Sequence, residues 1–202
     1  TPALGVLCAT GMIKGLLALL TTLNLLSATS GTYAILYAIA DSFFYFFPIL
    51  LGYTTAKKFN SNIFIGMTIG ASLVYPALAG LNSGEPIATL FKGTFIESVI
   101  HIKFMGIPVI LMTYSSSVIP IVLSVIFSSK IEKFFNKVIP SVVKTFLVPF
   151  CTLLIVVPLT FLVIGPVATW AGQLLGLVTS KVYSLSPLIA GAFIGGFWQV
   201  FV

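Results

Sequence analysis

The stretch 106–139, GIPVILMTYSSSVIPIVLSVIFSSKIEKFFNKVI, decides how the rest of the chain is interpreted. Its first part is an apolar segment with a polar seam, TYSSS at 113–117, set between Pro108 and Pro120. From Lys130 onward, apolar residues recur at i, i+3, i+4 and i+7, and lysines take the other face. This spacing predicts a short amphipathic helix on a membrane surface whose phosphates attract the lysines. A polar-seamed span followed by a basic surface helix favours a membrane transport protein.

The composition supports a location in the membrane. Hydrophobic residues make up 58% of the chain and charged residues 7%, whereas a soluble domain carries about 25% charge. All ten basic residues are lysines, so this chain offers no bidentate arginine clamp for phosphate or carboxylate. The lysines are scattered between apolar spans without forming a basic stripe, which argues against a nucleic-acid partner.

Because a transmembrane helix needs about 20 apolar residues, the sequence predicts an all-α, polytopic transmembrane helical bundle with an amphipathic helix on its cytoplasmic face. Both ends of the chain lie in apolar sequence, so residues 1–202 are expected to form a single fragment that is truncated at both ends. The predicted spans are 3–26, 32–54, 63–81, 104–127 and 142–164, followed by a partial or tilted segment at 167–186 and another span from Pro187.

The lysines predict the orientation of these spans. Lys57 and Lys58 close the second span, and four more lysines lie between the fourth and fifth. Two spans separate these segments, so both are expected on the same face, which the positive-inside rule makes cytoplasmic. The loop 82–103 would then face outward or fold back into the protein, and the chain would be a multi-pass protein of the plasma membrane.

Two charged residues inside predicted spans are candidate functional residues. Lys14 lies in the first span, and Asp41, the single aspartate of the chain, lies in the second. Charge at membrane depth is costly and usually marks a function or a partner. Lys14 can alternatively extend its amine to the interface. Asp41 needs a donor, either Lys14 or a hydroxyl, or else it binds a polar ligand such as a sugar hydroxyl.

Other polar residues offer weaker candidates. Tyr114, Ser115 and Ser116 in the seam can hydrogen-bond neighbouring helices or a sugar. Glu97 and His101 are four residues apart, so a helix would place them on one face, either as a polar lining or as loop packing. His101 is the single histidine, and the sequence predicts no metal site. A catalytic residue for an intramembrane protease is not expected either.

Several blocks of the sequence resemble one known family: TPALGVLCATGMIKGLLALL at 1–20, DSFFYFFPILLGYTTAKKF at 41–59, FMGIPVILMTYSSSVIPIVL at 104–123, PSVVKTFLVPFCTLLIVVPLTFLVIGPVATW at 140–170 and GAFIGGFWQVFV at 191–202. They are similar to the membrane-spanning enzyme IIC subunit of the bacterial phosphoenolpyruvate-dependent sugar phosphotransferase system. Within its glucose superfamily, YSSSVIP and the lysine-bearing helix after it most resemble the β-glucoside branch. Sucrose and trehalose permeases are close relatives.

The resemblance implies a homodimeric permease in the lipid bilayer that binds a β-glucoside or a related sugar outside and carries it inward. No cofactor is implied, because the phosphoryl donor is a phosphocysteine on a partner IIB domain, charged through IIA and ultimately by phosphoenolpyruvate. Cys8 and Cys151 lie in membrane spans and do not match that cysteine. The family's known sugar-contacting histidine and glutamate belong to motifs absent here, so Glu97 and His101 do not inherit those roles.

Two alternatives remain open from the residues alone. The chain could be half of an ion-coupled secondary sugar transporter, with Asp41 and Lys14 as the coupling pair, or a structural membrane domain. If the chain is instead part of a phosphotransferase permease, the residues expected to line its sugar route are Asp41, Lys14, Tyr114, Ser115 and Ser116.

Overall fold

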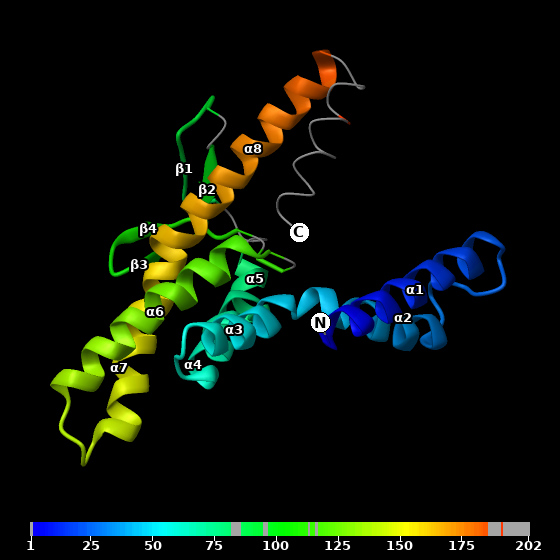
Figure 1. Ribbon diagram of the computed structural model, residues 1–202. Coiled ribbons are helices and arrows are strands. Elements are labelled where there is room, and N and C mark those ends of the chain that lie inside the picture. Colours follow the sequence, from blue (N-terminus) through cyan, green and yellow to red (C-terminus); the bar gives the residue numbers. More distant parts are fainter. Residues whose placement is uncertain are drawn as a thin grey trace.

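The computed structural model describes residues 2–81, 86–94, 97–112, 114–115, 117–185 and 191. Helices dominate the chain, and two short hairpins interrupt them (Figure 1). In chain order the elements are α1 (Pro2–Thr22), α2 (Gly31–Tyr45), α3 (Phe47–Lys58), α4 (Ile63–Leu73), α5 (Pro76–Gly80), β1 (Ala88–Leu90), β2 (Ser98–Ile100), β3 (Ile102–Phe104), β4 (Ile107–Val109), α6 (Ile119–Val138), α7 (Lys144–Leu159), the π-helical η2 (Thr160–Ile164) and α8 (Gly165–Leu185).

Helices α1 and α2 form an arm that projects from the rest of the molecule (Figure 1). A short loop joins them, with Asn24 in the left-handed conformation at φ 56°. Ser30 then caps α2, because its side chain accepts a hydrogen bond from the Tyr33 amide at 3.1 Å. Most large apolar side chains of the arm are exposed, as expected of helices that face lipid.

Helices α3 and α4 pack backbone against backbone. The carbonyl of Gly52 lies 2.5 Å from the position that a Cβ on Gly66 would occupy. A Cβ on Gly70 would lie just as close to the carbonyl of Pro48. Small residues permit this approach, which is how helices gain contact where no hydrophobic effect drives them together. Gly66 and Gly70, four residues apart on α4, therefore form a helix-packing surface.

Helix α6 lies against α3, α4 and α7 with a stripe of small residues. Ser124, Ser128 and Ser129 are buried, and each hydroxyl donates to a backbone carbonyl of the preceding turn. The Thr160 hydroxyl donates to Ser124 Oγ at 2.9 Å, which links η2 to α6. Apolar side chains that include Ile69, Ile121 and Val156 fill the core around this contact.

Among the described residues, four helical stretches are long and apolar enough to cross a membrane: Leu4–Thr22, Gly31–Lys58, Ile63–Gly80 and Lys144–Lys181. The expected polytopic helical architecture is thereby confirmed. The second and third stretches are divided, at Phe46 and near Tyr75, into two helices each. The last stretch joins the fifth predicted span to the described part of the segment at 167–186 in one continuous run of helix. The span expected from Pro187 lies outside the described residues.

The prediction of a span over 104–127 is wrong. Residues 102–109 form the antiparallel hairpin β3–β4, with Lys103 opposite Pro108. Met105 and Gly106 turn this hairpin with positive φ angles of 49° and 85°, and Pro120 fixes the first turn of α6. The expected amphipathic helix from Lys130 is the second half of α6, not a separate element. Hydropathy alone cannot distinguish an apolar hairpin from an apolar helix.

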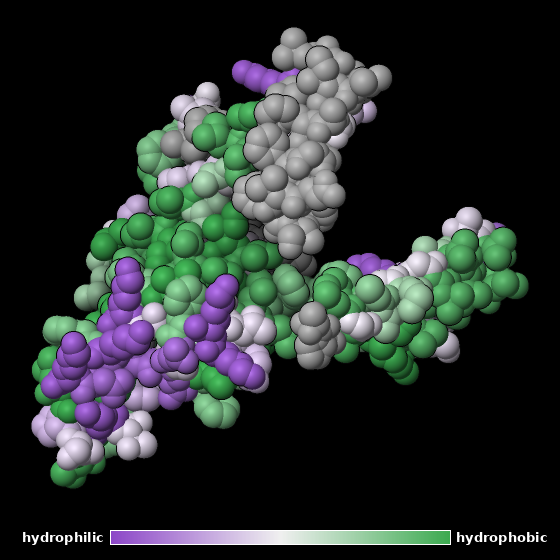
Figure 2. Space-filling view, in the orientation of Figure 1, coloured by the Kyte–Doolittle hydropathy of each residue, from purple (hydrophilic) through white to green (hydrophobic). Residues whose placement is uncertain are grey.

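The lysine-rich segments lie at one end of the molecule, as the sequence predicts. Lys57 and Lys58 lie in the last turn of α3. Asn62, whose side chain caps α4, donates its backbone N–H to the carboxylate of Glu132 in α6 at 2.9 Å. Figure 2 shows hydrophilic side chains gathered around the nearby ends of α6 and α7. The rest of this face is largely apolar.

A methyl group at Gly66 tests the α3–α4 contact. Gly66→Ala places a Cβ against the Gly52 carbonyl and the Ala56 side chain, so we expect a loss of about 1–3 kcal/mol in unfolding free energy. Gly172→Ala in α8 is the matched control, because a Cβ there meets no atom within 4 Å. Thermal unfolding of the full-length protein in detergent measures both. Equal midpoints for the two variants would contradict close packing at Gly66.

Candidate functional site

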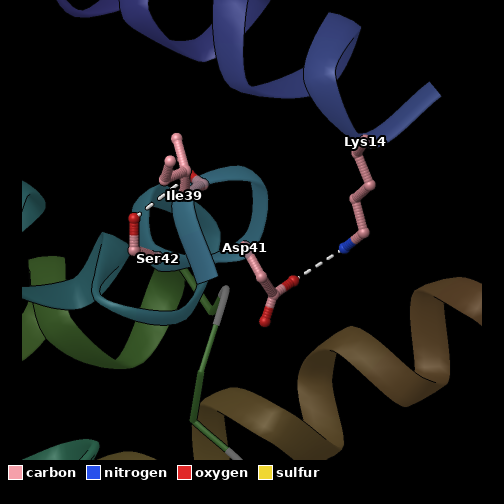
Figure 3. A network of polar contacts seen from close by, with 4 residues as sticks. All are labelled: Lys14, Ile39, Asp41 and Ser42. Carbon is pink, nitrogen blue, oxygen red and sulfur yellow. Dashed lines mark hydrogen bonds and ion pairs between the residues drawn. The ribbon is translucent and has the colours of Figure 1, made fainter. Parts of the chain in front are cut away.

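Lys14 and Asp41 form an ion pair between the two helices of the arm. Lys14 Nζ lies 2.7 Å from Asp41 Oδ1 (Figure 3). The same amine lies 5.6 Å from the ring centroid of Tyr37 and 5.5 Å from that of Phe44, a distance at which aromatic faces attract a cation. The expectation that Asp41 finds a donor in Lys14 is therefore confirmed.

The pair is only partly shielded by protein. The Lys14 side chain is 45% exposed and the Asp41 side chain 31%, and both residues lie in helices long enough to cross a membrane. The neighbouring hydroxyl of Ser42 donates to the backbone carbonyl of Ile39 at 3.3 Å (Figure 3). Each charge thus neutralises the other where water is scarce, which lowers the cost of carrying charge at membrane depth.

Tyr114 and Ser115 lie apart from the arm, at a cavity of about 140 Å³ in the helical body. The cavity is lined by Tyr45, Leu73, Val74, Leu78, Ala79, Leu111, Met112, Tyr114, Ser115 and Phe161. Two further members of the predicted seam, Thr113 and Ser116, fall outside the described residues. The structure therefore places two seam residues at a cavity and leaves the expected role of Ser116 untested.

The Tyr114 hydroxyl is buried and has no hydrogen-bond partner among the described residues. The ring packs edge-to-face on Phe161, with centroids 5.9 Å apart. The hydroxyl lies so close to Gly165 that a Cβ there would collide with it. Burial raises the pKa of the Tyr114 phenol, so the group keeps its proton and can act as a donor. The buried hydroxyls of Ser61 and Thr152 also lack a partner in the described part of the chain, so it is the position of Tyr114 at the cavity that makes its hydroxyl a candidate donor for a ligand.

Three interruptions of helical structure meet at this cavity. Tyr45 precedes the break between α2 and α3, Val74 lies at the break between α4 and α5, and Phe161 lies in η2. Leu111 and Tyr114 add non-helical backbone. Irregular backbone at membrane depth is tolerated where it is buried in protein or lines a cavity. Transporters place such broken helices at their substrate sites.

The ion pair and the cavity are connected along α2. Tyr45 follows Asp41 by four residues, so both lie on the same face of that helix, one turn apart. Tyr45 was not predicted as a site residue, although its spacing from Asp41 was a usable signal. Phe161 was not predicted either, because no local pattern marks it and only the tertiary fold brings η2 to Tyr114.

Glu97 and His101 do not lie on a helix, in keeping with their expected place in the loop 82–103. They flank strand β2, where residues four apart also share a face, since side chains alternate with a period of two. Both line a second cavity of about 280 Å³, which shares Leu111 and Met112 with the first. The Glu97 carboxylate accepts from the Gly93 amide at 2.8 Å, an interaction that supports the loop-packing interpretation.

Comparisons with known proteins identify relatives of the whole chain. Residues 1–202 match the family model described as "Phosphotransferase system, EIIC". The chain is 68% identical, over all of its length, to a "PTS system beta-glucoside-specific EIIBCA component" of Halalkalibacterium halodurans, of which it covers 32%. Over the same length it is 44% identical to the protein of that name from Dickeya chrysanthemi, of which it covers 31%.

A more distant relative has a different name. The chain is 30% identical to a "PTS system sucrose-specific EIIBC component" of Klebsiella pneumoniae, and the match covers 100% of this chain and 42% of the relative. The chain thus spans about a third of the length of the β-glucoside-specific relatives. No solved structure gives a significant match.

A double-mutant cycle tests the ion pair. We expect Lys14→Gln and Asp41→Asn each to lower the yield of folded full-length protein, because each leaves one charge unpaired in the membrane. Lys14→Gln should be the more damaging, since an unpaired lysine can still extend its amine to the interface. The double variant, with neither charge, should recover most of the yield.

Size-exclusion chromatography of the full-length protein measures these yields, with the exposed Lys92→Gln as a control for loss of a positive charge. A double variant that is no better than the worse single variant would show that the two charges act separately.

Proposed function

Because this chain belongs to the phosphotransferase system EIIC family, we propose that it works as part of a β-glucoside permease, with its sugar route passing the Tyr114 cavity. The observation that carries this site is the meeting of three helix interruptions around a buried, unpaired tyrosine hydroxyl. The names of the β-glucoside-specific relatives support the substrate class.

The chemistry of the cavity suits a neutral sugar. Its walls are mainly apolar, with hydroxyl groups from Tyr45, Tyr114 and Ser115. Apolar and aromatic surface packs against the carbon face of a sugar ring, and hydroxyls exchange hydrogen bonds with the ring substituents. With no arginine in the chain, an anionic substrate would lack a bidentate partner here.

We propose that phosphorylation is performed by partner domains. The names of the relatives combine B and C, or B, C and A, components in one protein, which supports IIB and IIA as partners. A sugar hydroxyl would attack the phosphorus of a phosphocysteine on IIB, so that an O–P bond forms, the S–P bond breaks and the hydroxyl proton passes to a base. This chain would contribute the route, with Asp41 and Lys14 beside it, and a homodimer is the proposed assembly.

Two alternative functions receive less support. In an ion-coupled carrier Asp41 and Lys14 would be the coupling pair, and their contact is compatible with that function as well. A purely structural domain would not require three helix interruptions to converge on one cavity, as they do around Tyr114. Family membership favours the phosphotransferase mechanism over both.

Uptake by membrane vesicles tests the mechanism. With the full-length protein, a labelled β-glucoside should accumulate as sugar phosphate when phosphoenolpyruvate and the general phosphotransfer proteins are supplied, and should not accumulate without them. Label that arrives unmodified, and whose uptake collapses with a proton or sodium ionophore, would instead establish an ion-coupled carrier.

Tyr114→Phe tests the site itself. Loss of the hydroxyl should weaken β-glucoside binding by about 1 kcal/mol, roughly five-fold in affinity. Unfolding stability should stay equal or rise, because the variant removes a buried donor that lacks a protein partner. Equilibrium binding and thermal unfolding give the two readouts, and the exposed Tyr183→Phe is the control. Lower stability with unchanged affinity would make Tyr114 a structural residue.

A further inference from the structure

Helix α6 presents a face that changes from apolar to basic along its length. Ile119, Leu123 and Phe127 are exposed on its first half, being 44%, 44% and 39% accessible. Lys130 and Lys137 continue the same line at the heptad spacing, and both are exposed. The change at Lys130 is where a lipid-facing helix would pass from hydrocarbon to the headgroup region.

A groove runs beside this change. It measures about 350 Å³ and is lined by Leu123, Ile126, Phe127 and Lys130 of α6, by Val163 and Ile164 of η2, and by Val167 of α8. Six of these seven residues are apolar, and Lys130 contributes the charge. The groove therefore combines a wall for a hydrocarbon chain with a single cation.

The electrostatic surroundings favour an anion near Lys130. Lys133 lies one turn further along α6 and is exposed. The acidic residue between them, Glu132, accepts a hydrogen bond at its carboxylate from the backbone N–H of Asn62, which caps α4. Phosphate groups of anionic lipids are attracted to such lysines by about 1 kcal/mol each near the membrane surface.

We propose that this groove holds one acyl chain of an anionic phospholipid, with the lipid phosphate against Lys130. A lipid matches both halves of the site, because its chain covers the apolar wall and its headgroup supplies the counter-charge. Charge complementarity distinguishes this occupant from an apolar protein segment, which would leave Lys130 without an anion. The assignment depends on a membrane location and is independent of the sugar that the protein carries.

Lipid binding to the purified full-length protein tests the proposal, with native mass spectrometry as the readout. The probes are phosphatidylglycerol and phosphatidylcholine with identical acyl chains. The wild-type protein should retain one phosphatidylglycerol more tightly than the rest and prefer it to phosphatidylcholine. Lys130→Gln should weaken that phosphatidylglycerol at least five-fold and remove the preference. Lys181→Gln removes an exposed lysine of α8 that does not line the groove, and it should leave the phosphatidylglycerol affinity and the lipid preference unchanged.

Two further variants separate the groove from the charge. Leu123→Trp and Val167→Trp fill it from opposite walls at exposed positions, where a larger side chain can be accommodated without disturbing the core. Each should displace both lipids while the net charge stays constant. Normal elution on size exclusion confirms that the variants fold.

Equal loss of lipid in Lys130→Gln and Lys181→Gln would show that lipid retention depends only on the net positive charge of the protein, and it would overturn the proposed site. Unchanged lipid retention in both tryptophan variants would also overturn it, and would show that another part of the protein or a second copy covers the groove.

Discussion

A backbone within a bilayer must satisfy its hydrogen bonds inside the protein, and this constraint accounts for where the chain is irregular. The described helices break after Tyr45, at Val74 and in the π-helical turn at Phe161, and all three places border one cavity. Freed backbone groups are thereby kept within the body and away from lipid. The same arrangement places polar side chains such as Tyr114 at a cavity inside the helical body, where a solute can contact them.

Close helix packing makes such an interior possible. Backbone contact between α3 and α4 at Gly52 and Gly66, and the buried serines of α6, hold the walls of the cavity without large side chains. The arm of α1 and α2 differs, because it buries little beyond Leu17 and Ala40 and makes its main contacts within itself. The body therefore has a fixed interior, and the arm is an appendage with mostly exposed apolar side chains that is joined to it through α3.

The sequence predicted those features that follow from the cost of charge in lipid. A contact between Lys14 and Asp41 was one of the options expected, because isolated charges at membrane depth are unfavourable, and the common end of the lysine-rich segments followed from the positive-inside rule. The hairpin at 102–109 was missed because the hydropathy of a short apolar run does not distinguish a strand from a segment of helix. Phe161 was missed because it is far from Tyr114 in the sequence, and only the tertiary fold brings the two rings into contact.

The distribution of charge also limits what the interior can carry. Lys57, Lys58 and most other lysines lie at helix ends or on the basic half of α6, whereas Lys14, in mid-helix, is neutralised by Asp41. The Tyr114 cavity thus has hydroxyls on its wall and no charged side chain among its lining residues. An anion entering it would lose hydration without gaining a counter-charge, at a cost of several kcal/mol. A neutral polyhydroxylated solute would exchange water for hydroxyl partners, so the absence of charged side chains among the lining residues favours a neutral solute over an anion at this cavity.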